Sequence, residues 1–190
     1  MTKAELLSLI DQAAVEGWTE LDLSGQGLTE LPEEIGQLTQ LERLILGKGK
    51  KDKDDNQQWG NTFINGKRQW GPLTIGNGLT KLPNWLANLD NLRYLDLSGN
   101  SLKNIPNWIA QLSALETLIA FTSQIIEIPE HIAQLSSLQT LNLSYNQITE
   151  IPEHIAQLSS LQTLNLSYNQ ITEIPEHIAQ LSSLQTLNLS

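Results

Sequence analysis

A stretch of 23 residues occurs twice in succession, letter for letter, and this period constrains the fold more than any other feature of the chain. The two copies cover residues 138–160 and 161–183, and a third copy stops after seven residues at Ser190. A looser form of the unit, L-x-x-L-x-L-x-x-N, recurs along the chain. Its first positions are Trp18, Leu41, Leu92, Leu115, Leu138, Leu161 and Leu184. Such a chain folds as a stack of similar units, because one unit alone cannot bury its apolar face.

The first residues of each unit predict a short strand. Leu141 and Leu143 alternate around Asn142, so both leucines point into the core and Asn142 points outward. Asn146 then turns the chain out of the strand, and its amide can bond backbone groups of the neighbouring turn. The opposite wall of the core is made by the apolar residues Ile148, Ile151, Ile155 and Leu158. The unit therefore predicts an α/β solenoid with one parallel strand per repeat.

The pattern divides the chain into two regions. Residues 1–17 predict an N-terminal capping helix, which opens with a T-x-x-E capping box at Thr2 and Glu5 and ends at Gly17. Its apolar stripe is Leu6, Leu7, Leu9, Ile10 and Ala14. Residues 18–190 form the repeat array, with six repeats and a truncated seventh. The unit that begins at Leu41 is 51 residues long instead of 23, so an insertion of 28 residues occupies about 48–75.

The repeat letters resemble a known family. The stretches LDLSGQGLTELPEEIGQLTQL and LNLSYNQITEIPEHIAQLSSL resemble leucine-rich repeats of the intracellular, Ras-group type. The N-terminal AELLSLIDQAAVEGWTELDLSGQGLTELP resembles the start of bacterial Roco proteins. The resemblance covers the chain apart from the insertion and implies a recognition and regulatory module without catalysis. In Roco proteins such an array precedes a Ras-like GTPase and a dimerisation domain, and this sequence contains no GTPase.

The outward positions of the predicted strands line the face that we expect to be concave. In the C-terminal units these positions are identical rows of Thr, Asn and Ser, and the simplest interpretation is a solvated surface. The earlier units are more varied, with Arg, aromatic and apolar side chains beside polar ones, as protein-binding surfaces have. The candidate partner-binding residues on this face are Arg43, Ile45, Tyr94, Asp96, Ile119 and Phe121.

The insertion predicts a β-hairpin that overhangs the same face. Asn65-Gly66 is a dipeptide that favours a two-residue hairpin turn. The insertion and its margin also hold six of the 11 basic residues of an otherwise acidic chain. One interpretation is a decorative loop whose aromatic side chains pack back on the array; the other is a partner-contacting lip. Its candidate residues are Trp59, Phe63, Arg68 and Trp70.

The sequence offers little for a metal, a cofactor or catalysis. The run DKDDN resembles the first half of a calcium loop but lacks the glycine and late glutamate that complete one. No phosphate-binding loop motif is present. All three histidines fall in one column with Trp85 and Trp108, on the side away from the strand serines. That column could hold a metal or sense pH, but core shielding is the simpler interpretation, and no enzyme, cofactor or metal site is predicted.

The composition of the chain limits the classes of partner that it can bind. The net charge of −10 disfavours nucleic acid and anionic membranes, because both carry negative phosphate. The chain lacks cysteine, a signal peptide and a long apolar stretch, which indicates a cytoplasmic protein. We therefore expect a scaffold that binds a protein of unknown identity. The alternatives are an architectural spacer and a regulatory part of a larger Roco-type protein.

Two positions and the C-terminus raise further expectations. Ala120 and Ser123 stand where neighbouring units have Leu and Asn, which predicts a loosely packed repeat. The last strand at Leu184–Ser190 lacks its returning wall and a polar cap, so we expect a fragment of a longer array. An uncapped strand edge also predicts self-association.

Overall fold

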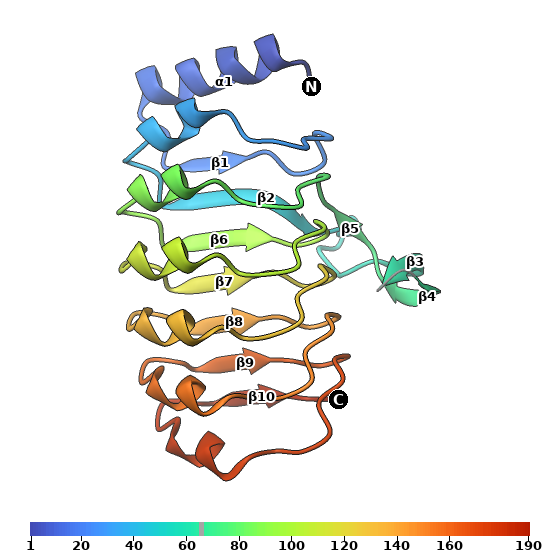
Figure 1. Ribbon diagram of the computed structural model, residues 1–190. Coiled ribbons are helices and arrows are strands. Elements are labelled where there is room, and N and C mark those ends of the chain that lie inside the picture. The colour runs from blue at the N-terminus through green and yellow to red at the C-terminus, as the bar shows by residue number, and fades with distance from the viewer. Residues whose placement is uncertain (65–66) are drawn as a thin grey trace.

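The computed structural model describes residues 1–64 and 67–190, and side chains outside 63–67. Each repeat contributes one strand to a parallel sheet whose strands follow one another in chain order (Figure 1). These strands are β1 (Glu20–Asp22), β2 (Arg43–Gly49), β6 (Tyr94–Leu97), β7 (Thr117–Ile119), β8 (Thr140–Asn142), β9 (Thr163–Asn165) and β10 (Thr186–Asn188). Equivalent residues of successive units pair directly, for example Thr140 with Thr163, so the solenoid expected from the 23-residue period is confirmed.

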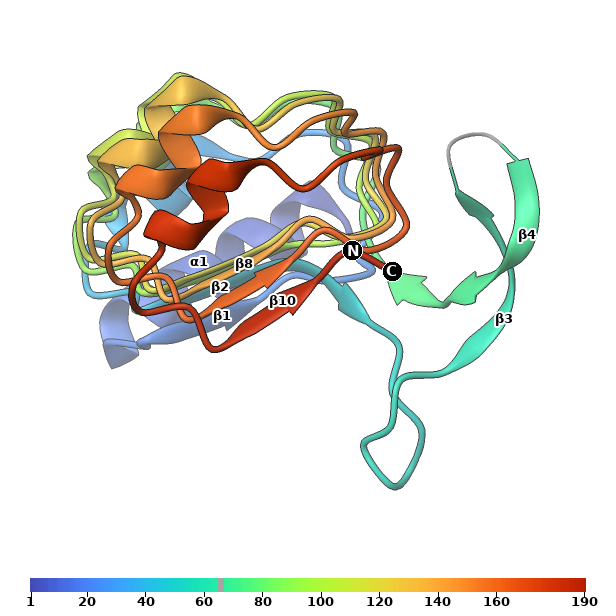
Figure 2. The same cartoon turned by 90° about the horizontal axis from the view of Figure 1, so that it is seen from below.

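The returning half of each unit forms a short 3₁₀ turn on the other side of the core (Figure 2). These turns are η1 (Glu33–Gln37), η2 (Asn84–Asn88), η3 (Asn107–Gln111), η4 (Glu130–Gln134), η5 (Glu153–Gln157) and η6 (Glu176–Gln180). A proline with extended backbone precedes each turn, as at Pro152, where the missing amide is not needed. Strand leucines such as Leu141 and turn residues such as Ile155 are both fully buried, so the two walls enclose one continuous core.

An asparagine ladder joins the strand exits at Asn77, Asn100, Asn146 and Asn169 to the preceding repeat, and it is interrupted at Ser123. Asn169 Nδ2 donates to Leu166 O and to Leu143 O in the preceding repeat, both at 2.9 Å. Its Oδ1 accepts the N–H of Ile148 at 3.0 Å. Asn146 makes the same two donations, to Leu143 O and Ala120 O, and this confirms the role expected for its amide.

The helix α1 (Lys3–Glu16) covers the first strand and the η1 turn at the N-terminal end (Figure 1). The predicted capping box is present: Thr2 N–H donates to Glu5 and Glu5 N–H donates to Thr2. Gly17 ends the helix in a left-handed conformation. Its buried face is Leu6, Ile10 and Ala13. The sequence-based stripe was wrong at Ala14, which is exposed, because the next core-facing position is three residues after Ile10, not four.

The insertion continues the second strand of the array instead of leaving it as a loop. β2 runs on to Gly49 and pairs antiparallel with β5 (Thr74–Ile75), while β3 (Trp59–Ile64) and β4 (Lys67–Pro72) pair as an antiparallel hairpin. The Asn65-Gly66 turn lies outside the described residues. Figures 1 and 2 show the hairpin projecting from one side of the stack.

The array resumes at Gly76-Asn77. Asn77 takes the ladder position of this repeat, with its Nδ2 donating to Leu23 O and Leu46 O. Glycine is required at both ends of the insertion, because a Cβ on Gly47 would lie 1.8 Å from Ser98 O and one on Gly76 would lie 1.9 Å from Gly99 O. Both ends of the insertion therefore pack closely against the backbone of the next repeat, at Ser98 and Gly99. Lys48 belongs to the insertion and not to the array.

No helix in residues 1–64 and 67–190 is long and apolar enough to cross a membrane.

Candidate functional site

The outer face of the sheet carries a hollow of about 650 Å³ where strands β2, β6 and β7 meet the insertion. Its floor contains all six candidate residues of the array, which are Arg43, Ile45, Tyr94, Asp96, Ile119 and Phe121. The wall supplied by the insertion includes Lys48, Lys51, Gln57 and Ile75. Residues from Arg43 to Asn142 thus share one hollow, which we call the insertion hollow.

One edge of the insertion hollow is a fixed row of charged and aromatic groups. Arg43 Nε donates to Glu20 Oε2 at 2.8 Å, and its guanidinium lies 3.9 Å from the centroid of the Tyr94 ring. The Tyr94 hydroxyl lies 3.5 Å from Asp96 Oδ2. Because parallel pairing places Glu20, Arg43 and Tyr94 side by side, the sheet register itself creates this row.

Asp96 lies at the bottom of the insertion hollow and is 4% exposed. The register places it between Ile45, which is 7% exposed, and Ile119. Its Oδ1 accepts Ser98 N–H at 3.0 Å and Ser98 Oγ–H at 2.5 Å. Burial raises the pKa of the Asp96 carboxyl to about 6 despite these two hydrogen bonds. The insertion hollow therefore combines apolar side chains with a buried carboxyl group whose pKa is raised to about 6.

The basic residues of the insertion are partly neutralised within the chain. Lys48 pairs with Asp22, and Lys51 Nζ lies 3.4 Å from Asp55 Oδ2. The DKDDN run is a closed turn in which Asp52 Oδ1 accepts the N–H groups of Asp54 at 2.8 Å and Asn56 at 3.0 Å. These bonds hold the pKa of Asp52 below its usual range. The described part of the chain contains no cluster of three or more histidine or acidic side chains suited to a metal.

A second hollow, of about 290 Å³, lies between the insertion and strands β8 to β10, and we call it the aromatic hollow. Tyr145 stacks on Tyr168 with ring centroids 4.2 Å apart, and Trp59 meets Tyr145 edge-on at 6.3 Å. The remaining lining residues are Gln57, Pro72, Phe121, Asn142, Ser144, Asn165, Ser167 and Asn188. Trp59 thus packs back on the array, as one of the two interpretations of the insertion expected.

Sequence reasoning missed the two tyrosines of the aromatic hollow. They occupy the position where Gly25 and Gly99 adopt positive φ, and Tyr145 and Tyr168 also have positive φ, at 56° and 53°. A bulky residue in this region is uncommon and costs conformational energy. The replacement of glycine by tyrosine at a left-handed position was the signal in the sequence that could have drawn attention to them.

The other candidates of the insertion are not brought into either hollow. Arg68 and Trp70 lie on β4, and Trp70 is 68% exposed at the surface of the hairpin. Neither residue lines the insertion hollow or the aromatic hollow. The side chain of Phe63 lies outside the described residues.

The histidine column on the opposite side of the stack has a structural role. His131, His154 and His177 are each half-buried, and Nε2 of each lies 3.1 Å from a carbonyl oxygen of the preceding repeat. The carbonyls belong to Ile105, Ile128 and Ile151. This histidine–carbonyl contact recurs in three successive repeats and joins each of them to the repeat before it.

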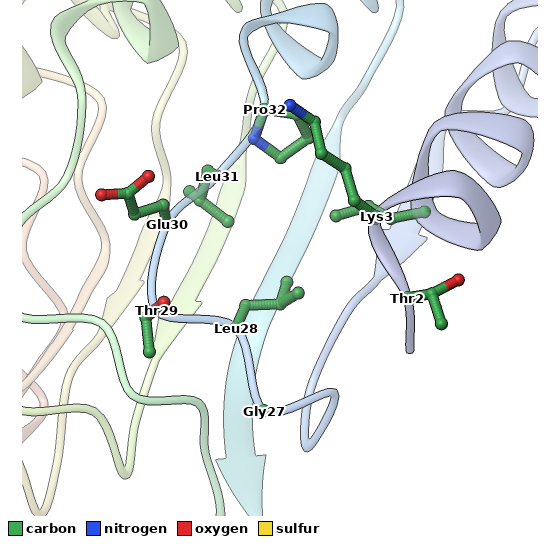
Figure 3. A pocket seen from close by; sticks show the side chains of 9 residues that line it. Thr2, Lys3, Gly27, Leu28, Thr29, Glu30, Leu31 and Pro32 are labelled. Carbon is green, nitrogen blue, oxygen red and sulfur yellow. The ribbon is translucent and has the colours of Figure 1, made fainter.

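A third hollow, of about 350 Å³, separates the start of α1 from the first returning segment (Figure 3). Lys3 extends along it toward Pro32, while Glu30 points away. It contains none of the candidate residues.

Comparisons with known proteins agree with this architecture. The model of the leucine-rich repeat family matches residues 76–125, 122–171 and 136–190. A leucine-rich repeat protein of Leptospira interrogans of known structure is 34% identical, with a TM-score of 0.65; the match covers 90% of this chain and 42% of that chain. A structure described as a TDR receptor has the same TM-score at 22% identity, over 98% of this chain and 33% of that one. This chain thus spans less than half of either protein. No curated protein matched the sequence.

Proposed function

Because this chain belongs to the leucine-rich repeat family, whose members are generally protein-interaction scaffolds without enzymatic activity, we propose that it binds a protein partner. The partner contacts the outer face of the sheet together with the insertion. The observation that carries this proposal is the insertion hollow, which gathers all six varied residues of the array against one wall of the insertion.

The chemistry of the hollow fits protein recognition. Ile119 and Phe121 offer apolar surface beside Arg43 and Tyr94, and Arg and Tyr are enriched at binding hot spots. The sheet holds these side chains in fixed rows, so little conformational entropy is lost when a partner binds. A net charge of −10 argues for a protein and against nucleic acid. We place the binding in the cytoplasm because the chain has no cysteine.

The test of this proposal substitutes two side chains that line the insertion hollow. The double variant Tyr94→Ala with Phe121→Ala removes two aromatic anchors that are not fully buried, so the core remains intact. The control is Ile174→Ala, which removes a side chain that is 65% exposed and lines neither hollow. Proteins captured from cells of the native host are compared for the three chains. We expect one partner to be lost with the double variant and kept with the control; a partner kept by both contradicts the proposal.

An alternative role is that of a regulatory or architectural part of a larger Roco-type GTPase protein. It is supported by the resemblance of the N-terminal segment to Roco proteins. A purely architectural array would capture the same proteins with and without Tyr94 and Phe121, so the same experiment separates the two roles.

We also propose that the 190-residue chain self-associates through β10. This strand pairs with β9 on one side, and Leu187 is 36% exposed. An open strand edge with exposed leucine favours pairing with another chain. Sedimentation should show a concentration-dependent dimer, and a strictly monomeric chain contradicts the idea.

A further inference from the structure

The aromatic hollow contains no charged side chain, although 17% of the residues of this chain are charged. Its lining consists of aromatic rings, one proline, amides and serine hydroxyls. The insertion hollow, which shares Gln57, Phe121 and Asn142 with it, in contrast contains Arg43, Lys48, Lys51, Asp55 and Asp96. An uncharged lining selects an uncharged ligand, because a buried charge without a partner is costly.

The three asparagines of the aromatic hollow are oriented as hydrogen-bond donors, whereas Gln57 donates through Nε2 to Gln58 O and Leu73 O and keeps its Oε1 as an acceptor. Asn142 Oδ1 accepts Ser144 N–H at 3.1 Å and Ser144 Oγ–H at 2.8 Å, and Asn165 Oδ1 accepts the same two groups of Ser167. Because a backbone N–H must face an oxygen, these bonds fix the orientation of each amide. The Nδ2 groups of Asn142, Asn165 and Asn188 have no hydrogen-bond partner within residues 1–64 and 67–190. One free N–H₂ donor therefore stands on each of three successive strands.

Exposed aromatic rings flank this row of donors. Tyr168 is 59% exposed and Trp59 is 47% exposed, while Tyr145 between them is buried. Tyr145 thus acts as the support that holds the two outer rings in place. The hollow presents flat apolar surface beside a line of donors.

We propose that the aromatic hollow binds a proline-rich segment of the protein partner in the polyproline II conformation. This inference rests on the proposed function and adds the chemical class of the partner sequence. Proline lacks an N–H group, so a proline-rich segment offers carbonyl acceptors to the free donors and no donors of its own. Proline rings pack on aromatic side chains, and grooves lined by aromatic residues are a recurring means of recognising such segments.

The spacing of the donors agrees with this ligand. Neighbouring strands of a sheet lie about 4.8 Å apart, so Asn142 and Asn188, two strands apart, are separated by roughly 9.6 Å along the stack. One turn of polyproline II contains three residues and advances about 9.3 Å. Carbonyl groups one turn apart on a ligand that runs across β8, β9 and β10 can therefore meet the donors of β8 and β10.

A neutral oligosaccharide is the competing ligand for an uncharged aromatic hollow. Each sugar hydroxyl both donates and accepts, so a sugar site needs side-chain acceptors as well as donors. The Oδ1 atoms of all three asparagines are already engaged by serines. The row of asparagine donors favours the proline-rich segment, although Gln57 Oε1 and the hydroxyl groups of the lining can accept, and the oligosaccharide becomes an outcome of the test.

The experiment measures the fluorescence anisotropy of a labelled, end-blocked decaproline peptide on titration with the 190-residue chain. A glycine–serine decapeptide and cellohexaose, a neutral oligosaccharide, serve as the comparison ligands. We expect decaproline to bind at least about tenfold more tightly than the flexible decapeptide, because its conformation is already formed. Absence of decaproline binding, or competition by cellohexaose with no preference for decaproline, overturns the proposal.

Two variants test the mode of binding. Asn165→Asp keeps the oxygen that accepts from Ser167 but replaces the donor, and Asp96 with Ser98 shows that an aspartate fits this position of the repeat. We expect about tenfold weaker binding. Tyr168→Ala should weaken binding to a similar extent while Tyr168→Phe, which keeps the ring face, should not. If Asn165→Asp does not fold, the Tyr168 pair decides alone.

Equal affinity of the wild-type chain, Asn165→Asp and Tyr168→Ala for decaproline overturns the assignment. These substitutions lie outside the insertion hollow, and the probe is a defined peptide. Phe121 lines both hollows, but Tyr94 lines only the insertion hollow, so Tyr94→Ala alone tests the proposed function independently of the decaproline result, and the two proposals fail separately.

Discussion

Replacing Asp96 by asparagine should stabilise the protein at neutral pH. Burial raises the pKa of this carboxyl from its ordinary value of 3.8 to about 6, so ionising it is unfavourable in the folded chain. An asparagine can keep the bonds from Ser98, as Asn142 does with Ser144. A difference of about two pKa units corresponds to about 3 kcal/mol in the free energy of unfolding, which is the upper limit of the expected gain.

The sign of the pH dependence follows from proton binding. Between about pH 4 and pH 6 the folded chain holds the Asp96 proton more tightly than the unfolded chain does. The contribution of Asp96 to the free energy of unfolding therefore falls as the pH rises through this window, and the cost is complete above it. The difference between Asp96→Asn and wild type should be near its minimum at pH 4, grow up to about pH 6 and stay constant at higher pH.

Urea unfolding of both chains at pH 4, 5, 6, 7 and 8, followed by circular dichroism, measures this difference. Asp22→Asn is a matched control at the same outward position of another strand. Burial raises the pKa of Asp22, but its hydrogen bonds from Lys48 and Ser24 outweigh burial and hold the pKa below 3.8. The control should therefore lose stability at pH 7. A difference for Asp96→Asn that does not change with pH, or a loss of stability at pH 7, refutes the reasoning.

Three further predictions concern the array. Removing residues 48–75 joins Gly47 to Gly76 and should leave the solenoid folded, because the ladder resumes at once at Asn77; loss of the cooperative thermal transition would show that the insertion is structural. Ser123→Asn should raise the free energy of unfolding by about 1 kcal/mol, because the buried Ser123 hydroxyl has no hydrogen-bond partner among the described residues and an asparagine can extend the ladder; chemical unfolding that shows no gain counts against this. Ala120→Leu should add about 2 kcal/mol by filling a fully buried position, whereas a lower melting temperature would mean that the space is already occupied.

Most of the fold could be predicted from the period of the repeat. The alternation around Asn142 determines which side chains enter the core, and copying a unit copies its contacts, so strand order and register follow from the 23-residue spacing. The capping box at Thr2 and Glu5 is equally local, since both partners lie within one helical turn. Local patterns of this kind can be recognised without knowledge of the rest of the chain.

The candidate site could be anticipated only in part, because it depends on how the insertion folds back. Variety in the early repeats indicated Arg43, Ile45 and Tyr94, and the sheet register then placed them together. The contact between Trp59 and Tyr145 joins two parts of the chain 86 positions apart and has no trace in either local pattern. The free Nδ2 donors of Asn142, Asn165 and Asn188 were not predicted either, because identical rows of asparagine in repeated units are most simply interpreted as a solvated surface.

The most direct test of the binding proposal is the affinity of the purified partner for the chain that lacks residues 48–75. Isothermal titration calorimetry compares this variant with the wild-type chain and with Ile174→Ala. We predict that the deletion variant, folded by its circular dichroism, binds at least about a hundredfold more weakly, because it loses one whole wall of the insertion hollow. Equal affinities of the deletion variant and the wild-type chain would contradict the proposal that the insertion and the sheet form one binding site.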